Sequence, residues 1–105
     1  MLYIIYQEDG PDSLAIRAAT KEKHFAYLAE HEDILVLGGA LLAEDEQKTR
    51  VGSTLIINVP SLADAQKFSE NEPFRKAGLF KSVKITRMRR GQWNPAAAPK
   101  TPEGN

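Results

Sequence analysis

The sequence predicts an α+β domain of β-α-β-β-α-β order, in which two helices cover one face of a four-stranded antiparallel sheet. Three observations lead to it. Four segments are rich in β-branched and aromatic residues, two segments have amphipathic helical spacing, and turn-forming residues stand between them. This order is the ferredoxin-like arrangement. With 105 residues and no cysteine, the chain should form one domain with a modest core and no disulfides.

The four strands are expected at residues 2–7, 34–42, 51–59 and 80–88. The first strand is apolar on both alternating sets, so both of its faces should be covered. Gly38 and Gly39 interrupt the second strand, which indicates either a β-bulge or the close approach of a backbone or a ligand. In the third strand, the better core face is formed by Val51, Ser53, Leu55, Ile57 and Val59.

Two helical pieces are expected between the first and second strands. Asp12 or Ser13 can cap a short helix through residues 14–18, and Thr20 is the natural N-cap of an amphipathic helix over residues 20–33. Arg17 lies seven residues before His24, so the two share one helical track if the pieces are nearly coaxial.

The second helical region follows the third strand. Ser61 and Asp64 form a capping signal, and the helix after them should bury Leu62, Ala65 and Phe68. Pro73 restricts Glu72 and starts another short turn, which Gly78 ends.

The polar run at residues 43–50 is predicted to be an exposed hairpin loop, and residues 1–90 to form the domain. Residues 91–105 are too poor in apolar bulk to pack alone and are predicted to be a flexible tail rich in proline and alanine. Arg87, Arg89 and Arg90 cluster near Trp93; solvated arginines at the end of a strand are the expected explanation, and an anion site is the alternative.

Fourteen basic and fourteen acidic side chains cancel, so nothing in the net charge argues for a nucleic acid or a membrane partner. The apolar N-terminal run is too short for a signal h-region or a membrane span, and we expect a cytoplasmic protein. The sheet face away from the helices should carry Tyr3, Ile5 and Ile56. Because an uncovered apolar face is best explained by a second copy, a homodimer is predicted.

Four segments, in chain order, resemble the YciI-like (YCII-related) family. They are the first strand with the following residues 8–13; residues 14–17 leading to His24-Phe-Ala-Tyr-Leu28; Gly52-Ser-Thr-Leu-Ile56; and Asn71-Glu-Pro-Phe74 through residues 77–80. The resemblance covers roughly residues 1–90. It implies a dimeric α+β barrel, in which two ferredoxin-like sheets meet face to face.

The family resemblance also implies a pocket around a His–Asp pair, and one branch looks like a dehydrochlorinase of chlorinated hydroxyhydroquinone. The family histidine matches His24. The acidic partner, the Asp of an Asp-Pro-Tyr/Phe motif, falls on Glu72, whose side chain is one methylene longer. A carboxylate beside a histidine fixes its tautomer and stabilises the imidazolium, which suits general acid–base chemistry.

Around this pair, Arg17 can hold an anionic substrate, Ser53 can donate a hydrogen bond, and Phe74 is a further candidate substrate contact. Each has a structural alternative: Arg17 can be the ion-pair partner of Asp12 or Glu72, and Ser53 and Phe74 can serve the fold. His31 has no motif support. No cofactor is expected, and no metal, because His24 and His31 lie two turns apart without a converging ligand cluster.

Three functions therefore compete. The first is a small cofactor-independent enzyme of lyase, dehydrochlorinase or isomerase type, acting on a small anionic or aromatic metabolite with His24 and Glu72 as catalytic residues. The second is a non-catalytic ligand-binding or accessory domain that uses the same pocket. The third is a purely structural dimeric module.

Overall fold

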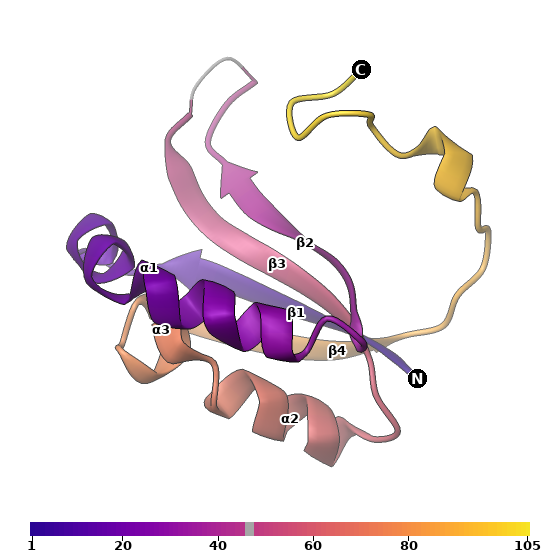
Figure 1. Ribbon diagram of the computed structural model, residues 1–105, viewed down its shortest axis with the longest axis horizontal. Helices are drawn as coiled ribbons and strands as arrows, with labels where there is room; N and C mark the ends of the chain where they lie inside the picture. The colour runs from indigo at the N-terminus through magenta and orange to yellow at the C-terminus, as the bar shows by residue number, and fades with distance from the viewer. Residues whose placement is uncertain (46–47) are drawn as a thin grey trace.

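The computed structural model describes residues 1–45 and 48–105. Its helices and strands follow the order β1 (Leu2–Asp9), α1 (Ser13–Glu30), β2 (Leu35–Leu42), β3 (Arg50–Asn58), α2 (Leu62–Glu70), α3 (Pro73–Lys76), β4 (Phe80–Met88) and η1 (Pro95–Ala97). The strands form one antiparallel sheet of order β2-β3-β1-β4, and the helices lie on one of its faces (Figure 1). The predicted ferredoxin-like α+β fold is confirmed.

The core lies between the helices and the inner face of the sheet. Strand β1 contributes Tyr3 and Ile5 to it, strand β3 contributes Leu55 and Ile57, and α2 adds Ala65 and Phe68. Leu55, Ile57 and Val59 therefore confirm most of the core face predicted for the third strand, whereas Val51 is exposed. Leu62, expected to be buried, is 46% exposed because it stands at the first position of α2, at the rim of the core.

The prediction that Tyr3 and Ile5 face away from the helices is wrong. Both are buried in the core, so the alternating residues Leu2, Ile4 and Tyr6 form the outer face of β1. Ile4 pairs with Ile56 of β3, which does lie on the outer face as predicted. The open face is therefore apolar, but the β1 side chains on it are Leu2, Ile4 and Tyr6 and not Tyr3 and Ile5.

The helix between β1 and β2 is continuous from Ser13 to Glu30, so Thr20 is not an N-cap. Residues 14–19 are mostly good helix formers, which lets the helix pass through Thr20 without a break. Asp12 occupies the N-cap position without a side-chain hydrogen bond. Because the helix is continuous, Arg17 and His24 lie on the same helical face. The sequence predicted this only if two separate helices were coaxial.

The capping signal of α2 is confirmed, since the Ser61 side chain accepts a hydrogen bond from the Asp64 backbone at 3.1 Å.

At the paired glycines of β2 the pairing with β3 is regular, with Gly38 opposite Leu55 and Gly39 opposite Thr54. The two register shifts of this strand pair flank the glycines, between Leu35 and Leu37 and between Leu41 and Leu42.

Of the predicted hairpin loop at residues 43–50, residues 46–47 lie outside the described residues, and Arg50 belongs to β3. After β4 the chain leaves the sheet and curves away from the helices (Figure 1). The boundary near residue 90 and the flexibility of the tail stay predictions. Among the described residues, no helix is both long and apolar enough to span a membrane.

Candidate functional site

The site centres on a contact between His24, on the inner side of α1, and Glu72, in the turn between α2 and α3. His24 Nδ1 lies 2.5 Å from Glu72 Oε1. The Glu72 side chain is 1% exposed and that of His24 is 15% exposed. The two residues are 48 positions apart in sequence, and the packing of α1 beside α3 brings them together.

Two further contacts hold this pair in place. The second carboxylate oxygen of Glu72 accepts a hydrogen bond from the backbone N–H of Arg75 at 3.1 Å, which caps α3. The buried ring of Phe74 stacks on the imidazole of His24, with centroids 3.9 Å apart and planes 15° apart. The short helix α3 therefore fixes both the carboxylate and one face of the imidazole.

His24 lines the cavity described below, and its other ring nitrogen is Nε2. Nε2 has no hydrogen-bond partner within residues 1–45 and 48–105. In the same residues, every buried side-chain nitrogen and oxygen has a hydrogen-bond partner. Nε2 is therefore reached by solvent. Because a carboxylate accepts and does not donate, Glu72 favours the tautomer with the proton on Nδ1, which leaves the Nε2 lone pair open.

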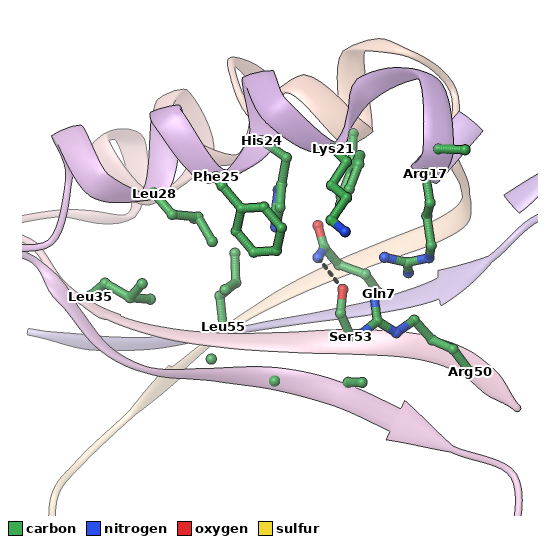
Figure 2. Close-up of a pocket in the computed structure, with 15 residues that line it drawn as sticks. Gln7, Arg17, Lys21, His24, Phe25, Leu28, Leu35, Arg50, Ser53 and Leu55 are labelled. Carbon is green, nitrogen blue, oxygen red and sulfur yellow. Dashed lines mark hydrogen bonds between the residues drawn. The ribbon is translucent and has the colours of Figure 1, made fainter. Parts of the chain in front are cut away.

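A cavity of about 530 Å³ lies between α1 and strands β2 and β3 (Figure 2). Its size is in the range of small-molecule sites. The side chains of α1 form one wall, and those of β3 with the backbone of β2 form the other. The lining includes four of the five predicted site residues: Arg17, His24, Ser53 and Phe74. The fifth, Glu72, is buried behind His24.

Arg17 pairs with Asp9, and not with Asp12 or Glu72, the two partners named in its structural alternative. Its guanidinium donates to both oxygens of the Asp9 carboxylate, at 2.8 and 3.3 Å. Asp9 ends β1, and the turn after it places this carboxylate below the first turns of α1. The guanidinium carbon also lies 5.2 Å from the centroid of the Phe74 ring, a cation–π contact that keeps Arg17 at the cavity wall.

Ser53 is held by Gln7 as a hydrogen-bond acceptor, and its own hydroxyl hydrogen stays available to donate. Its hydroxyl oxygen accepts a hydrogen bond from the Gln7 side-chain amide at 2.9 Å, and Gln7 is 2% exposed (Figure 2). Gln7 thus presents an inward-facing polar group on β1, which the alternation of apolar residues did not reveal. The pair supplies a hydrogen-bonding patch on the sheet side of the cavity.

Lys21 and Arg50 also line the cavity and were not predicted. Figure 2 shows the nitrogen ends of Arg17, Lys21 and Arg50 gathered near Gln7 at one end of the cavity. Partial burial, followed by the neighbouring charge of Arg17, lowers the pKa of Arg50, while Asp9 acts in the opposite direction. Lys21 follows Arg17 by four residues, so both lie on the same face of α1. This spacing was the sequence signal that could have revealed Lys21 as a lining residue.

The opposite end of the cavity is apolar, and His24 stands between the two ends (Figure 2). This end is lined by Phe25, Leu28, Leu35 and Leu55. Gly38 borders the same region, and a Cβ there would come within 2.8 Å of a Leu55 methyl group. In the part of the chain that the structure describes, no group of three or more His, Asp or Glu side chains is placed to hold a metal ion.

Comparison with known proteins agrees with this architecture. The model of the YCII-related domain matches residues 1–89. The chain belongs to the YCII-related family. Protein YciI of Escherichia coli O6:H1 is 33% identical over 91 residues, covering 81% of this chain and 93% of that protein. An uncharacterised protein of Haemophilus influenzae is 29% identical over 89 residues, covering 79% and 91%.

Among solved structures, this YCII-related chain is similar to 5-chloro-2-hydroxyhydroquinone dehydrochlorinase (TftG) from Burkholderia phenoliruptrix, in complex with 2,5-dihydroxybenzoquinone. The two are 35% identical, with a TM-score of 0.79, and the match covers 87% of this chain and 96% of that one. An antibiotic biosynthesis monooxygenase is 15% identical with a TM-score of 0.52 over 88% of this chain and all of that one, which shows likeness of fold alone.

Proposed function

We propose that this YCII-related protein is a small cofactor-independent enzyme in which His24, held by Glu72, performs general acid–base chemistry on a small ring metabolite. One observation carries the proposal. A buried carboxylate holds Nδ1 of His24 at 2.5 Å, while His24 lines a cavity of ligand size and its Nε2 has no hydrogen-bond partner among the described residues. A base needs this arrangement of an oriented ring and a free lone pair.

In the proposed reaction, neutral His24 accepts a proton at Nε2 from a substrate hydroxyl or ring carbon. The Glu72 carboxylate stabilises the imidazolium that forms, through the Nδ1–H it already accepts. In an isomerisation the same nitrogen returns the proton to a different atom. In a dehydrochlorination the carbon–chlorine bond breaks with its electron pair on chloride, and the proton stays on His24 until solvent removes it.

Support for the elimination comes from the similarity to TftG, which is named a dehydrochlorinase and was solved with a small quinone ring. The pocket of this chain has the parts that such a ligand needs. Phe25 and three leucines accommodate a ring, and cations at the other end favour ionised oxygens. These features extend the proposal to lyase-type chemistry on hydroxylated rings, with the individual substrate left to assay.

The test is turnover of a panel of hydroxylated and chlorinated rings, followed by chloride release and by ultraviolet absorbance. For any substrate found, His24→Gln should lower kcat by about 100-fold or more, since the general base is lost. Glu72→Gln should also lower kcat, because the imidazolium loses its counter-charge. His31→Gln, at the C-cap of the same helix and bordering a different cavity, is the matched control. Unchanged kcat in His24→Gln would remove His24 from the reaction.

The alternative function is a non-catalytic binding domain that uses the same cavity. One observation favours it: no Asp, Glu or second His among the described residues lines the cavity, so His24 has no partner acid there. Tight binding of a ring compound that is recovered unchanged after long incubation would select this function over the enzyme.

We also propose that two copies pair through the open sheet face, forming the dimeric α+β barrel that the family resemblance implies. The supporting observation is the apolar strip of Leu2, Ile4, Tyr6 and Ile56, which no helix of the described chain covers. Pairing of two such faces would bury the strip on both copies.

A further inference from the structure

The cationic end of the cavity carries more positive charge than its own acidic neighbours offset. It is formed by Arg17, Lys21 and Arg50, whose nitrogen ends converge (Figure 2). Asp9 pairs with Arg17 at 2.8 Å. Within residues 1–45 and 48–105, Lys21 and Arg50 form no salt bridge. Asp9 is also a neighbouring negative charge of Arg50, and no Asp or Glu among the described residues lines the cavity, so that part of the chain does not balance the three positive charges.

Such a grouping is unfavourable without an anion. Like charges brought together at a partly desolvated site repel, and the lowered pKa of Arg50 reflects both burial and the charge of Arg17. Lys21 and Arg50 are exposed, so solvent reaches their charges in the free protein. A ligand anion placed between these cations would relieve their mutual repulsion.

The rest of the cavity limits what the ligand can be. Its far end is apolar, with Phe25, Leu28 and Leu55 among the lining residues, and His24 lies between the two ends. A volume of about 530 Å³ accommodates one substituted ring and not a large cofactor. The ligand must therefore carry its charge at one end and an apolar ring at the other, with the bond to be changed between them.

We propose that Lys21 and Arg50 bind the carboxylate substituent of a small cyclic acid and thereby place its ring beside Nε2 of His24. A guanidinium matches a planar carboxylate through two parallel hydrogen bonds, and the lysine adds a point charge. Arg17 is not the main anchor, because Asp9 already occupies its guanidinium. The inference rests on the proposed function only in placing the substrate in this cavity.

The proposal predicts a preference that can be measured without turnover. The probes are 2,5-dihydroxybenzoate and 1,4-dihydroxybenzene, which differ only in the carboxylate, titrated calorimetrically into the full-length His24→Gln protein. The carboxylated ring should bind about tenfold tighter or more. Lys21→Met and Arg50→Gln should each reduce that preference, and the double variant should abolish it, while affinity for the neutral ring stays unchanged.

The matched control is Lys23→Met, an exposed position of the same helix outside the cavity, which should retain the full preference. Circular dichroism checks that each variant keeps its fold. Equal affinity for the two rings, no binding of the carboxylated ring at millimolar concentration, or a preference that survives in the double variant would each overturn the proposal. Tighter binding of phenyl phosphate than of the dihydroxybenzoate would also overturn it, by assigning the cations to a phosphate.

These outcomes separate the two proposals. If His24 is not a base, turnover is unaffected in His24→Gln, yet the carboxylate preference is still seen. If Lys21 and Arg50 do not anchor a carboxylate, the preference is missing, yet His24→Gln still lowers kcat. In an active protein the anchor has its own signature: Lys21→Met and Arg50→Gln should raise KM for the acid substrate more than they lower kcat.

Discussion

Each carboxylate oxygen of Glu72 has a separate partner. One lies 2.5 Å from His24 Nδ1, and the other accepts from the Arg75 backbone and so caps α3. The same short helix carries Phe74, which stacks on the imidazole. The family resemblance implies an aspartate here, one methylene shorter; in this chain one oxygen of the longer glutamate reaches the histidine while the other caps α3.

Tyr27 stands one turn after His24 and ties α1 to α2. Its hydroxyl donates to the Phe68 carbonyl at 2.7 Å. Burial, together with the negative charges of Glu72 and Glu30, raises the pKa of Tyr27 from 10.0 to about 12. The neutral phenol is thus favoured in the folded protein, so its contribution to stability is complete below pH 10 and is lost as pH rises through 12.

Tyr27→Phe should therefore show a pH-dependent cost. Below pH 10 the variant should lose about 1 kcal/mol of unfolding free energy with the hydrogen bond. Between pH 10 and 12 this difference should narrow, because in the wild type the unfolded phenol ionises before the folded one. Urea denaturation of both proteins across this range measures it. A difference that stays constant from pH 8 to pH 12 would contradict the assignment.

At single positions, the sequence predicted the residues of the dyad but not most of their surroundings. The His24–Glu72 pair followed from a family pattern, which carries long-range information that a single sequence lacks. The partner of Arg17 depended on where β1 ends relative to α1, so Asp9 was missed in favour of Asp12 or Glu72. Lys21 had only its four-residue spacing from Arg17 as a signal and Arg50 had none, since surface lysines and arginines are common on helices and strands.

Strand β1 shows why the faces of a sheet can be misjudged. Both of its alternating sets are apolar, and the inward set of Tyr3 and Ile5 ends in polar Gln7. Gln7 is buried because its amide donates to Ser53, so a polar residue marks the inner face here. The element order, by contrast, was predictable, because turn residues and changes of hydrophobic period mark each boundary.

Gly52 of β3 lies directly against the backbone of β1. A Cβ built on Gly52 would lie 2.1 Å from the backbone oxygen of Gln7, which cannot move without disturbing the pairing of Glu8 with Gly52. Gly52→Ala should therefore destabilise the fold by about 1–3 kcal/mol, as overpacking does. It should also displace Gln7 and the Ser53 hydroxyl at the cavity.

The control for Gly52→Ala is Gly39→Ala, in the neighbouring strand β2, where a Cβ would meet nothing within 4 Å. That substitution should be neutral or stabilise by up to about 1 kcal/mol, because the unfolded chain loses freedom. Chemical denaturation gives both values. Equal effects of the two substitutions would show that the close backbone approach does not limit the strand pairing.

The molecule as a whole has one sheet face covered by helices and one open. If the open face pairs, light scattering after gel filtration should give twice the chain mass for the wild type. Ile4→Glu should shift the protein to the monomer, because the charge would be buried between two sheets without a partner. Leu14→Glu, at a position of α1 that is 84% exposed, is the control and should remain dimeric. A monomeric wild type at micromolar concentration would rule the pairing out.

The placement of the cationic end also determines how easily amino-acid substitutions can alter the ligand preference of the cavity. Lys21 lies on α1 and Arg50 at the start of β3; both are long, exposed side chains outside the core. Neither contacts the His24–Glu72 pair through a hydrogen bond or salt bridge in the described residues. Substituting Lys21 and Arg50 by residues of another charge should change which ligands the cavity prefers, at little cost to folding. They are therefore the first positions to vary when engineering a new substrate preference.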